Sequence, residues 1–584
     1  MKAATVAPAR WGLQDGVPYS EAYGDVYHSA AGGAEQARFV FLDGNQIRTR
    51  WAGRERFVIL ETGFGFGLNF LATLQAWRRS PGRKLHYVAV EKHPFSLPDL
   101  RALHARYPEL QSEAAELHAV WPPLVSGGHR AELGSVVLTL FFADIGVVRD
   151  LTLAADAFYL DGFAPAKNPE MWSPQVMRAL SRLAAPGATA ATWSVAAPVR
   201  HALEQTGFVV EKRPGFGDKR EMLVASIKKG FEAPFAQRKA AVIGAGLAGA
   251  AVCERLCARG WQVDLYERHA APAQEASGNL AGAFHPVVTP DDSIFARLTR
   301  SGFLMSINSW KRIPGIRWDG CGVLQLARDA KELASQERAV AGLPPEYAQF
   351  VTRAEASRHA GVPVTADGLW FPRGGWIQPQ TLVSAQLASC GSNLRMHFNR
   401  EIKALPAAPV VILANGTDQL RRVPQLRLRR VRGQLSYVPA ERFEPPHAVV
   451  LRGGMVLPPV DGLCAVGATY DLDDDDASPR AESDAGNLSR LQDILDVRIE
   501  NQGLKSRVAF RSVAPDRLPV VGRIADNVYG AFAYGSRGLI WAALAAELIA
   551  CELEGEPLPV EGALAKAIDP ARFRRRAEAR GSRP

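Results

Sequence analysis

Two glycine-rich turns, far apart in the chain, contain the residues best suited to chemistry. The first lies in FVILETGFGFGLNF and the second in AAVIGAGLAGAAV, and their glycines are Gly63, Gly65, Gly67, Gly244, Gly246 and Gly249. Glycines at this spacing let a chain turn tightly after a strand and bring backbone N–H groups up to a nucleotide-like cofactor. Two such turns predict two cofactors, and two cofactors predict two reactions on one polypeptide.

An acidic residue on each side of the first turn indicates which cofactor it binds. Glu61 precedes the glycines, and Glu91 ends the next strand, YVAVE. The glycines together with Glu91, whose carboxylate can accept hydrogen bonds from ribose hydroxyls, fit NAD, FAD or S-adenosylmethionine. A carboxylate facing the turn repels a pyrophosphate and attracts a cation. Glu61 therefore favours S-adenosylmethionine, which carries a sulfonium and a cationic amino group.

Two aspartates end the apolar runs that follow. Asp144 ends VVLTLFFAD, where it either binds the adenine amino group or caps a helix. Asp161 ends FYLD at the same edge of the predicted sheet. Methyl transfer to an amine needs an unprotonated, aligned nitrogen, so a carboxylate that binds the amine and takes a proton assists it. We expect Asp161 to be catalytic, the alternative being that it only caps the next turn, and Phe163 or Trp172 to stack on a planar base.

The second turn belongs to a complete dinucleotide-binding unit of strand, glycine turn, helix and strand. The second strand ends in Glu267, which favours an unphosphorylated ribose and hence FAD or NAD. Three later segments favour a flavin oxidase over an NAD dehydrogenase: EASGNLAGAFHP, VVILANG and YGSRGLIWA. Their cofactor-binding candidates are Ser277, Gly278, Asn279, Gly416, Arg537, Gly538 and Leu539. The helix that begins near Gly538 directs its N-terminus toward the flavin, where it can stabilise negative charge on the reduced ring.

The elements that position these residues predict an α/β fold. Apolar strands alternate with helices, for example a helix over 68–78 and a strand over 85–91, which is typical of a parallel sheet covered on both faces. Charge, glycine and proline in SIKKGFEAPFAQRK predict a linker at 229–238, between domains at 1–228 and 239–584. The β-rich pieces GQLSYVP and GMVLPPV predict an antiparallel substrate subdomain inserted into the second domain.

Composition narrows the class of protein and of partner. The 584 residues carry a net charge of +9, which fits either a polyanionic partner or an enzyme from an arginine-rich proteome. Arginines in LRLRRVRG form either an RNA-binding surface or an ordinary exposed strand. The six cysteines form no C-x-x-C pair, and we expect buried reduced thiols and no metal. Without a signal peptide or an apolar run of about 18 residues, we expect a cytoplasmic protein with no membrane partner.

The chain resembles the bifunctional MnmC family of tRNA wobble-uridine modification enzymes over nearly its whole length. The resemblance is carried by YSEAYGDVYHS, FLDGNQI, ETGFGFGLNF, YLDGFAPAKNPEMW, VIGAGLAGA, ASGNLAGAFHP, VRGQLSYVP and YGSRGL, which occur in this order. It implies a Rossmann-like S-adenosylmethionine methyltransferase followed by a D-amino-acid-oxidase-like FAD domain. The FAD domain would remove the carboxymethyl group from 5-carboxymethylaminomethyluridine, often 2-thiolated, and the first domain would methylate the resulting amine.

The resemblance also implies a substrate clamp and a possible set of partners. Arg511 matches the arginine with which the glycine oxidase group grips a substrate carboxylate, and Ser512 follows it where many relatives have proline. Besides tRNA, the partners would include the enzymes that install the carboxymethylaminomethyl group.

Two other functions remain open on the sequence. One is a small-molecule amine oxidase, of the glycine or sarcosine type, fused to a methyltransferase. The other is an RNA-binding protein with vestigial nucleotide pockets, which is disfavoured because Glu91 and Glu267 accompany intact glycines.

Overall fold

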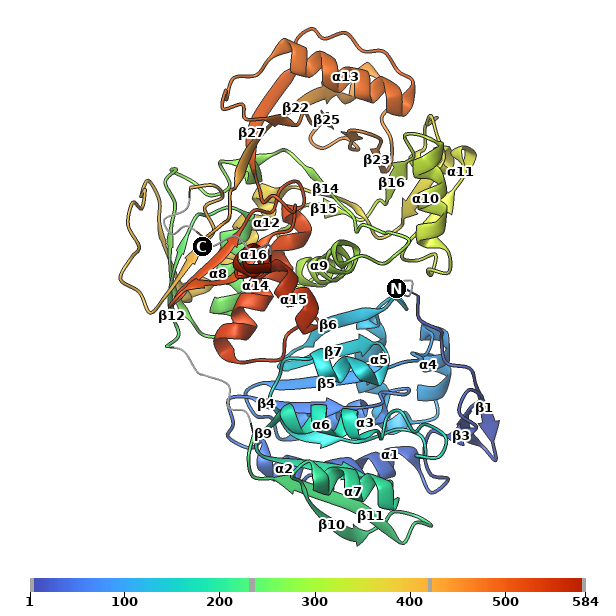
Figure 1. Ribbon diagram of the computed structural model, residues 1–584. Helices are drawn as coiled ribbons and strands as arrows, with labels where there is room; N and C mark the ends of the chain where they lie inside the picture. Colours follow the sequence, from blue (N-terminus) through green and yellow to red (C-terminus); the bar gives the residue numbers. More distant parts are fainter. Residues whose placement is uncertain (1–4, 231–236, 419–422, 580–584) are drawn as a thin grey trace. The chain divides into compact units, whose positions relative to one another are not determined.

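The computed structural model describes residues 5–230, 237–418 and 423–579, and these fold into two compact units (Figure 1). The N-terminal unit contains residues 5–230 and 551–563, and the C-terminal unit contains residues 237–550 and 564–579. The segment 551–563 thus belongs to the N-terminal unit, although the predicted boundary assigned it to the second domain. Most of the predicted linker, residues 231–236, lies outside the described residues.

The N-terminal unit is built on an eight-stranded sheet with the order β10-β11-β9-β8-β4-β5-β7-β6. The five central strands are parallel, and β6, β10 and β11 run antiparallel to their neighbours. The central strands are β9 (Ala184–Thr192), β8 (Ala155–Tyr159), β4 (Phe57–Glu61), β5 (Leu85–Glu91) and β7 (Val136–Phe142). The carboxyl ends of β4, β5 and β8 therefore meet at one edge, which brings the predicted site residues together.

Helices cover both faces of this sheet because successive side chains of a strand point to opposite faces. In β4, Ile59 packs into the core formed with α3 (Leu68–Arg79), and Leu60 packs into the core formed with α6 (Pro174–Arg182). Both side chains are completely buried. This confirms the parallel, doubly covered sheet predicted for the first domain.

The other elements of the N-terminal unit flank the central strands. They are β1 (Trp11–Gln14), β2 (Val17–Ser20), β3 (Asp25–Val26), α1 (Gly33–Gln36), η1 (Ala37–Asp43), α2 (Ile47–Arg50), α4 (Leu97–His104), η2 (Pro108–Leu110), α5 (Gln111–Val120), β6 (Gly127–Leu133), η3 (Ile145–Asp150), α7 (Ala197–Gln205), β10 (Val209–Pro214) and β11 (Glu221–Ile227).

The C-terminal unit contains a six-stranded sheet with the order β20-β13-β12-β21-β29-β28. Its members are β20 (Leu394–His397), β13 (Gln262–Tyr266), β12 (Lys239–Ile243), β21 (Val410–Leu413), β29 (Val528–Phe532) and β28 (Val520–Ala525), and all neighbours except β28 and β29 are parallel. The helices α8 (Leu247–Cys257) and α14 (Gly538–Glu554) follow the glycine turns after β12 and β29. The expected βαβ unit is therefore present.

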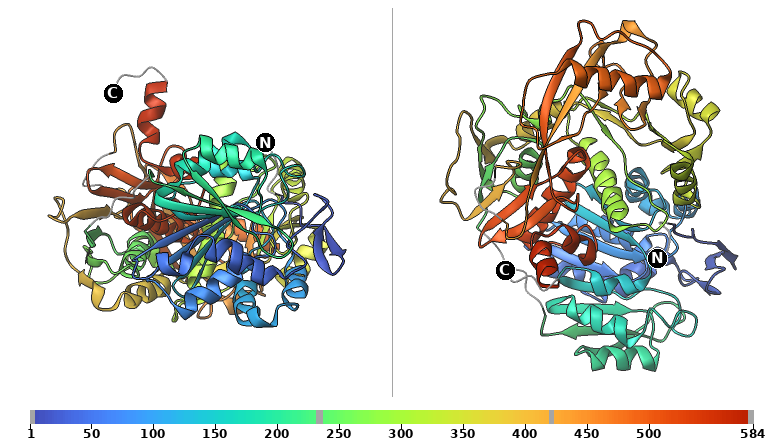
Figure 2. Two further views of the ribbon diagram at one scale, coloured as in Figure 1. Left: turned by 90° about the horizontal axis from the view of Figure 1, so that it is seen from below. Right: turned by 45° about the horizontal axis from the view of Figure 1, so that its top comes forward.

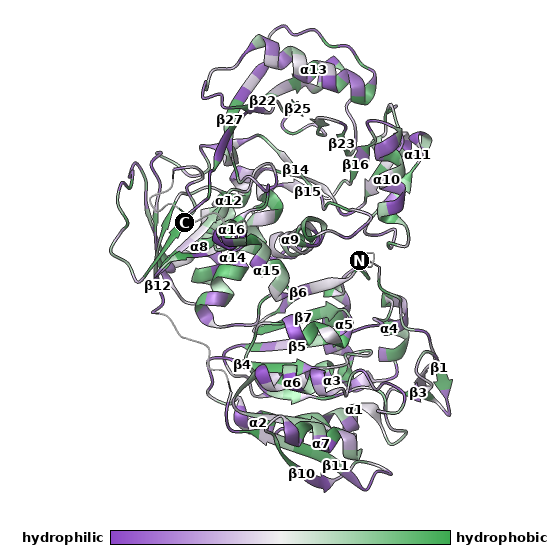
Figure 3. Ribbon diagram, viewed as in Figure 1, coloured by the Kyte–Doolittle hydropathy of each residue, from purple (hydrophilic) through white to green (hydrophobic). Residues whose placement is uncertain are grey.

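A nine-stranded sheet forms the predicted substrate subdomain. GQLSYVP lies in β22 (Arg429–Pro439), which pairs antiparallel with both β25 (Leu463–Gly467) and β27 (Lys505–Val513). The sheet is mixed rather than purely antiparallel, because β16 (Val323–Leu326) and β23 (Val449–Leu451) run parallel. The helix α13 (Ala481–Leu495) lies across it (Figure 2) and shows alternating apolar and polar stripes (Figure 3).

The remaining elements of the C-terminal unit are shorter. They are η4 (Ala276–Gly278), β14 (Gly282–Phe284), α9 (Ile294–Trp310), β15 (Trp318–Asp319), α10 (Ala330–Val340), β17 (Gln349–Val351), α11 (Arg353–Ala360), β18 (Gly368–Phe371), β19 (Gly375–Ile377), α12 (Pro379–Ser389), η5 (Gly391–Asn393), η6 (Ala440–Arg442), β24 (Met455–Val456), β26 (Asp471–Leu472), α15 (Gly562–Ile568, of which 562–563 count with the N-terminal unit) and α16 (Arg572–Ala579). None of the helices in the described residues combines the length and apolarity needed to cross a bilayer.

Two candidate active sites

The first candidate site is a cavity of about 510 Å³ at the carboxyl edge of the N-terminal sheet. It is lined by all three glycines of the first turn and by three of the predicted acids, namely Gly63, Gly65, Gly67, Glu91, Asp144 and Asp161. Gly67 adopts φ 84° directly before α3, a left-handed conformation that a residue with a side chain rarely takes. The turn therefore exposes backbone to the cavity and starts the helix at the same point.

Glu91 is held at the rim of this cavity by the backbone. One of its carboxylate oxygens accepts a hydrogen bond from the Gly65 N–H at 2.7 Å, and the other accepts one from the His93 N–H at 2.7 Å. The side chain thus braces the glycine turn while it faces the cavity, where its remaining lone pairs can bind ribose hydroxyls. Burial raises the pKa of the Glu91 carboxyl, and these backbone donors counteract the rise.

Asp161 faces the same cavity and shares a hydrogen-bond donor with Glu61. The amide nitrogen of Asn69, in the first turn of α3, donates to Asp161 Oδ2 at 2.7 Å and to Glu61 Oε1 at 2.7 Å. The other Asp161 oxygen accepts from the Gly162 N–H at 2.9 Å. These donors aim the Asp161 carboxylate, while burial raises its pKa to about 6. Sequence reasoning missed Asn69, whose only signal was its position in the first turn of the helix after the glycines.

Glu61 does not line the cavity, contrary to its expected place in front of the glycines. It is completely buried behind the cavity wall, where it accepts hydrogen bonds from Asn69 and from the Tyr87 hydroxyl at 2.9 Å. Its direction follows from strand parity, because the last residue of β4 points into the core that contains Tyr87. Burial raises the pKa of Glu61 well above its ordinary value, and the Asp161 charge adds to the rise.

Asp144 has one of the two roles considered for it. Its side chain caps η3 by accepting a hydrogen bond from the Gly146 N–H at 3.0 Å, and it forms an ion pair with Lys92 at 3.1 Å. It also lines the cavity and remains half exposed. The capping role is therefore present, and the adenine contact stays a prediction.

Aromatic rings close the cavity beside Asp161. Phe163 stacks on Tyr23 with their ring centroids 4.6 Å apart and an interplanar angle of 24°, and both residues line the cavity. Trp172 instead lies in the hydrophobic core, where its indole N–H donates to the Phe163 carbonyl at 3.0 Å. Two aromatic residues were expected to stack on a base. Phe163 lines the cavity and is available for this, whereas Trp172 lies in the core and holds the Phe163 backbone through a hydrogen bond.

The charges of the first cavity favour a cationic ligand. Among the described residues that line it, the carboxylates are Glu21, Glu91, Asp144, Asp161 and Glu170, and the lysine and arginine side chains are Arg10 and Lys92. A positive charge brought among these carboxylates is attracted by all five, and it stabilises most the ionised forms of Glu91 and Asp161, whose pKa burial raises. The chemistry of this lining fits the sulfonium and amino groups of S-adenosylmethionine and opposes a pyrophosphate.

We expect methyl transfer to depend on pH through Asp161. Only the ionised carboxylate accepts a proton, so kcat/KM for methylation should rise as pH increases through about 6 and then level off with respect to this group. Asn69→Ala removes a hydrogen bond that lowers the Asp161 pKa. In this variant the rise of kcat/KM with pH, the acidic limb of the profile, should therefore move to higher pH. Single-turnover methylation measured between pH 5 and 9 tests both expectations, and an unmoved limb in Asn69→Ala would contradict the assignment to Asp161.

The second candidate site is a larger cavity of about 1400 Å³ in the C-terminal unit. Of the predicted cofactor-binding residues, Gly244, Gly246, Glu267, Ser277, Asn279, Gly416, Arg537, Gly538 and Leu539 line it. Glu267 is held as Glu91 is, with one oxygen accepting from the Ala245 N–H at 2.8 Å and the other from the His269 N–H at 3.0 Å. The sequences EKH and ERH thus form the same carboxylate brace after two different glycine turns.

Gly249 and Gly278 lie behind this cavity rather than on its surface. A Cβ atom on Gly249 would lie 1.9 Å from the Gly244 carbonyl oxygen, so the third glycine lets α8 pack against the turn. A Cβ atom on Gly278 would lie 2.4 Å from the Arg507 guanidinium. Both glycines therefore allow close packing behind the cavity. Neither lies where it would contact a cofactor directly.

Unpartnered polar atoms belong to several residues of the second cavity, as is compatible with a polar ligand. Within the described residues, four buried side-chain oxygens lack a hydrogen-bond partner and belong to residues that line the cavity, namely those of Asn279, Asn415, Ser512 and Tyr534. A buried polar group without a partner costs roughly 1–3 kcal/mol. A ligand rich in donors and acceptors, such as FAD, would satisfy them, so the lining fits the predicted cofactor.

The N-terminus of α14 supplies positive charge on one side of this cavity. Arg537 precedes the helix and is almost completely enclosed, which lowers the pKa of its guanidinium to about 10. One of its nitrogens lies 3.4 Å from the His285 carbonyl oxygen, to which it donates. The guanidinium, with the free N–H groups of the first helical turn, can stabilise an anion in the cavity.

Arg511 points into the same cavity from β27 and lacks an acidic partner. It donates to the Thr469 carbonyl oxygen at 3.1 Å, and no aspartate or glutamate among the described residues forms an ion pair with it. Burial lowers the pKa of this guanidinium, which nevertheless stays charged. A half-buried cation without an ion-pair partner is suited to bind a ligand carboxylate.

Gly433 provides the space in which the Arg511 guanidinium lies. Strands β22 and β27 pair with Val431 opposite Arg511 and Gly433 opposite Ala509, so Gly433 is a diagonal neighbour of Arg511 on one face. A Cβ atom on Gly433 would lie 2.3 Å from Arg511 Nη1 and 2.6 Å from its Cζ. The glycine of VRGQLSYVP is therefore a positioning residue that sequence reasoning missed.

We expect Gly433→Ala to displace the Arg511 guanidinium and to weaken carboxylate binding by about 10-fold, the value of one hydrogen bond to a charged group. The measurement is the tRNA concentration that half-saturates flavin reduction in anaerobic stopped flow. The double variant Gly433→Ala with Arg511→Ala should bind no more weakly than Arg511→Ala alone, because Gly433 acts through the arginine. Additive losses in the double variant would contradict this.

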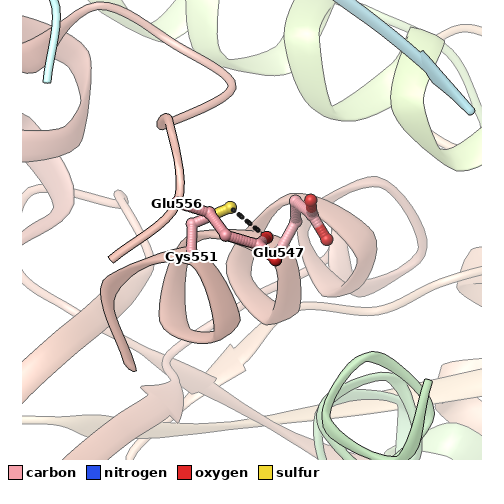
Figure 4. A group of neighbouring side chains, drawn as sticks. All are labelled: Glu547, Cys551 and Glu556. Carbon is pink, nitrogen blue, oxygen red and sulfur yellow. Dashed lines mark hydrogen bonds between the residues drawn. The ribbon is translucent and has the colours of Figure 1, made fainter. Parts of the chain in front are cut away.

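A third group of side chains lies at the end of α14 and just beyond it. Ligand atoms of Glu547, Cys551 and Glu556 lie within 4.8 Å of one another (Figure 4). Glu547 pairs with Arg255 and Arg259, each at 2.9 Å, and Glu556 lies 3.4 Å from the His86 ring. Glu547 is thus balanced by two buried guanidinium groups, and none of the three residues lines either cavity.

Comparison with known proteins agrees with this division into two sites. Residues 239–552 match the family model described as FAD dependent oxidoreductase, and residues 108–228 match S-adenosyl-L-methionine-dependent methyltransferase. The chain is 47% identical to the "tRNA 5-methylaminomethyl-2-thiouridine biosynthesis bifunctional protein MnmC" of Azoarcus sp. (strain BH72), covering 96% of each chain. It is 46% identical to the protein of the same name from Paraburkholderia phytofirmans, covering 97% of this chain and 98% of that one. Among solved structures, glycine oxidase from Geobacillus kaustophilus covers 55% of this chain and 95% of its own at 20% identity, with a TM-score of 0.47.

Proposed function

The chain belongs to the MnmC family of bifunctional tRNA-modification enzymes, and we propose how its two cavities divide that work among named residues. It is an enzyme with an FAD-dependent oxidoreductase unit and an S-adenosylmethionine-dependent methyltransferase unit, and it modifies the wobble uridine of tRNA. The relatives match over nearly the full length of both chains, which favours tRNA over a free amino acid as the substrate.

In the C-terminal cavity, we propose that Arg511 binds the carboxylate of the carboxymethylaminomethyl group. The observation that supports this is its half-buried guanidinium, which lines the cavity and forms no ion pair with an acidic side chain of the described residues. Bound FAD supplies two-electron oxidation of the C–N bond, and bound S-adenosylmethionine supplies the methyl group in the other cavity. Glu267 and the glycine turn would hold the FAD ribose and pyrophosphate, and Arg537 with the α14 N-terminus would stabilise negative charge on the reduced flavin.

In the N-terminal cavity, we propose that Glu91 binds the ribose of the methyl donor and that Asp161 binds the aminomethyl nitrogen. Asp161 takes the proton that this nitrogen loses, and Asn69 holds the carboxylate in the direction of the cavity. Phe163, stacked on Tyr23, offers a flat surface for the uracil ring. Glu61 acts at a distance, by orienting Asn69.

Incubating tRNA that carries 5-carboxymethylaminomethyluridine with the enzyme and each cofactor separately tests the order of the two reactions. Mass spectrometry of wobble nucleosides should show aminomethyluridine after incubation with FAD alone and methylaminomethyluridine only when S-adenosylmethionine is added. Reduction of the flavin by free glycine or sarcosine as fast as by tRNA would instead favour the small-molecule oxidase.

We also propose that the enzyme works in the cytoplasm and associates with the enzymes that install the carboxymethylaminomethyl group. Copurification of these enzymes from cell extract tests the association.

A further inference from the structure

Tyr470 stands out among the aromatic residues of the protein because its ring is exposed inside a cavity. Half of its surface is accessible, and among the described residues only Phe39 is another exposed aromatic side chain. Phe39 packs against Phe216 with their ring centroids 5.8 Å apart, whereas no aromatic ring of the described chain packs against Tyr470. Tyr470 lines the C-terminal cavity, so its free face is available to a ligand there.

The position of Tyr470 relates it directly to the carboxylate clamp. It follows Thr469, whose carbonyl oxygen anchors Arg511, and the Arg511 guanidinium carbon lies 5.7 Å from the centre of the Tyr470 ring. Asp471 and Leu472 then form β26, which pairs with β22 and fixes the ends of this short segment. The ring and the cation are therefore held together by one backbone segment.

The chemistry of the substrate matches this pair of groups. In 5-carboxymethylaminomethyluridine, four covalent bonds join C5 of the base to the carboxyl carbon, a span on the order of 5 Å. That span is comparable to the 5.7 Å between the guanidinium carbon and the ring centre. A carboxylate on Arg511 therefore leaves the uracil ring within reach of Tyr470. Aromatic side chains commonly bind unstacked bases of RNA by stacking on them.

We propose that Tyr470 is the stacking platform for the wobble uracil in the oxidoreductase cavity, and that it makes this site prefer a nucleobase-bearing substrate over a free amino acid. The inference rests on the proposed function of Arg511 and adds the recognition of the base. Because the uracil is not altered by the oxidation, Tyr470 is a specificity-determining residue, and its contribution should appear in binding of the tRNA.

The test compares Tyr470→Ala, Tyr470→Phe and Leu472→Ala in the full-length enzyme with FAD. Leu472 is a matched control, because it is 49% exposed on the same segment but does not line the cavity. Tyr470→Ala should raise the tRNA concentration that half-saturates flavin reduction about 5- to 100-fold, the range for loss of one base–aromatic stack. Tyr470→Phe and Leu472→Ala should stay within about 2-fold of the wild type, since the stack is retained in both.

Glycolate, a carboxylate with neither a base nor an amine, separates base recognition from the clamp. Its binding, followed by the perturbation of the flavin spectrum, should be unchanged in Tyr470→Ala. Equal weakening of glycolate and tRNA in this variant, an equal loss in Leu472→Ala, or unaltered tRNA binding in Tyr470→Ala would each overturn the inference. If wild-type flavin is not reduced by the tRNA at all, the proposed function itself fails, a result distinct from these three.

Discussion

Asp161→Asn should slow methyl transfer to aminomethyl-tRNA by about 10²- to 10⁴-fold, the usual contribution of a general base. Asparagine has nearly the same shape, but it cannot take the proton from the nitrogen or attract its positive charge. The substitution also replaces one carboxylate oxygen by an NH2 group, which cannot accept a hydrogen bond. In the wild type the amide nitrogen of Asn69 donates to Asp161 Oδ2 at 2.7 Å. The loss should therefore lie mainly in the chemical step.

Single-turnover transfer of a labelled methyl group measures this loss, and two controls locate it. Glu170→Gln removes a carboxylate from the lining of the same cavity, but this side chain is 71% exposed, and we expect its rate to stay within about 3-fold of the wild type. Flavin reduction in Asp161→Asn should be unchanged, and calorimetry should still show binding of S-adenosylmethionine. Methyl transfer at the wild-type rate would remove Asp161 from the catalytic residues.

Arg511→Ala should weaken productive binding of the tRNA to the oxidoreductase cavity by about 10²- to 10³-fold, as expected when one partner of a buried charge pair is removed. The loss should be large because Arg511 is half-buried and has no other acidic partner among the described residues. Arg511→Lys keeps the charge but loses the planar fork, so it should recover only part of the affinity.

Anaerobic flavin reduction measures this effect at several tRNA concentrations. Arg328→Ala is the matched control, since Arg328 lines the same cavity, pairs with Glu332 at 2.8 Å and is 67% exposed. We expect a change below about 3-fold in that variant, because exposed ion pairs contribute little. A rate of reduction in Arg511→Ala that matches the wild type at all tRNA concentrations would exclude the carboxylate clamp.

The two cofactor turns were predictable because all their parts lie close together in the sequence. A buried strand, a glycine turn and a helix follow one another in both units, and the acid at the end of the next strand reaches back to the turn over a short, regular connection. Spacing along the chain therefore sets the distance between the carboxylate and the turn. Glu91 and Glu267 lie where this rule puts them, with closely matching hydrogen bonds.

The expected orientation of Glu61 was wrong for a reason that is equally physical. The sequence places it directly before the glycines, but only the parity of β4 within the folded sheet decides on which side of the strand its carboxylate lies. The structure turns it inward, onto Asn69 and Tyr87, whereas Asp161 and Glu91 are among the carboxylates that line the cavity.

By itself, the sequence determined the two nucleotide-binding turns, the α/β fold of both units and the acids at the ends of the strands that follow the turns, because local spacing specifies these. Only the tertiary structure decided which side chains share a cavity. Asn69 joins two carboxylates from different strands, Gly433 makes room for Arg511 across the β22–β27 pair, and Tyr470 lies beside that arginine. These contacts depend on the register of the strands and on the face of the sheet to which each side chain points. Both are set by the pairing of strands that are distant in the sequence, and a local sequence pattern does not specify them.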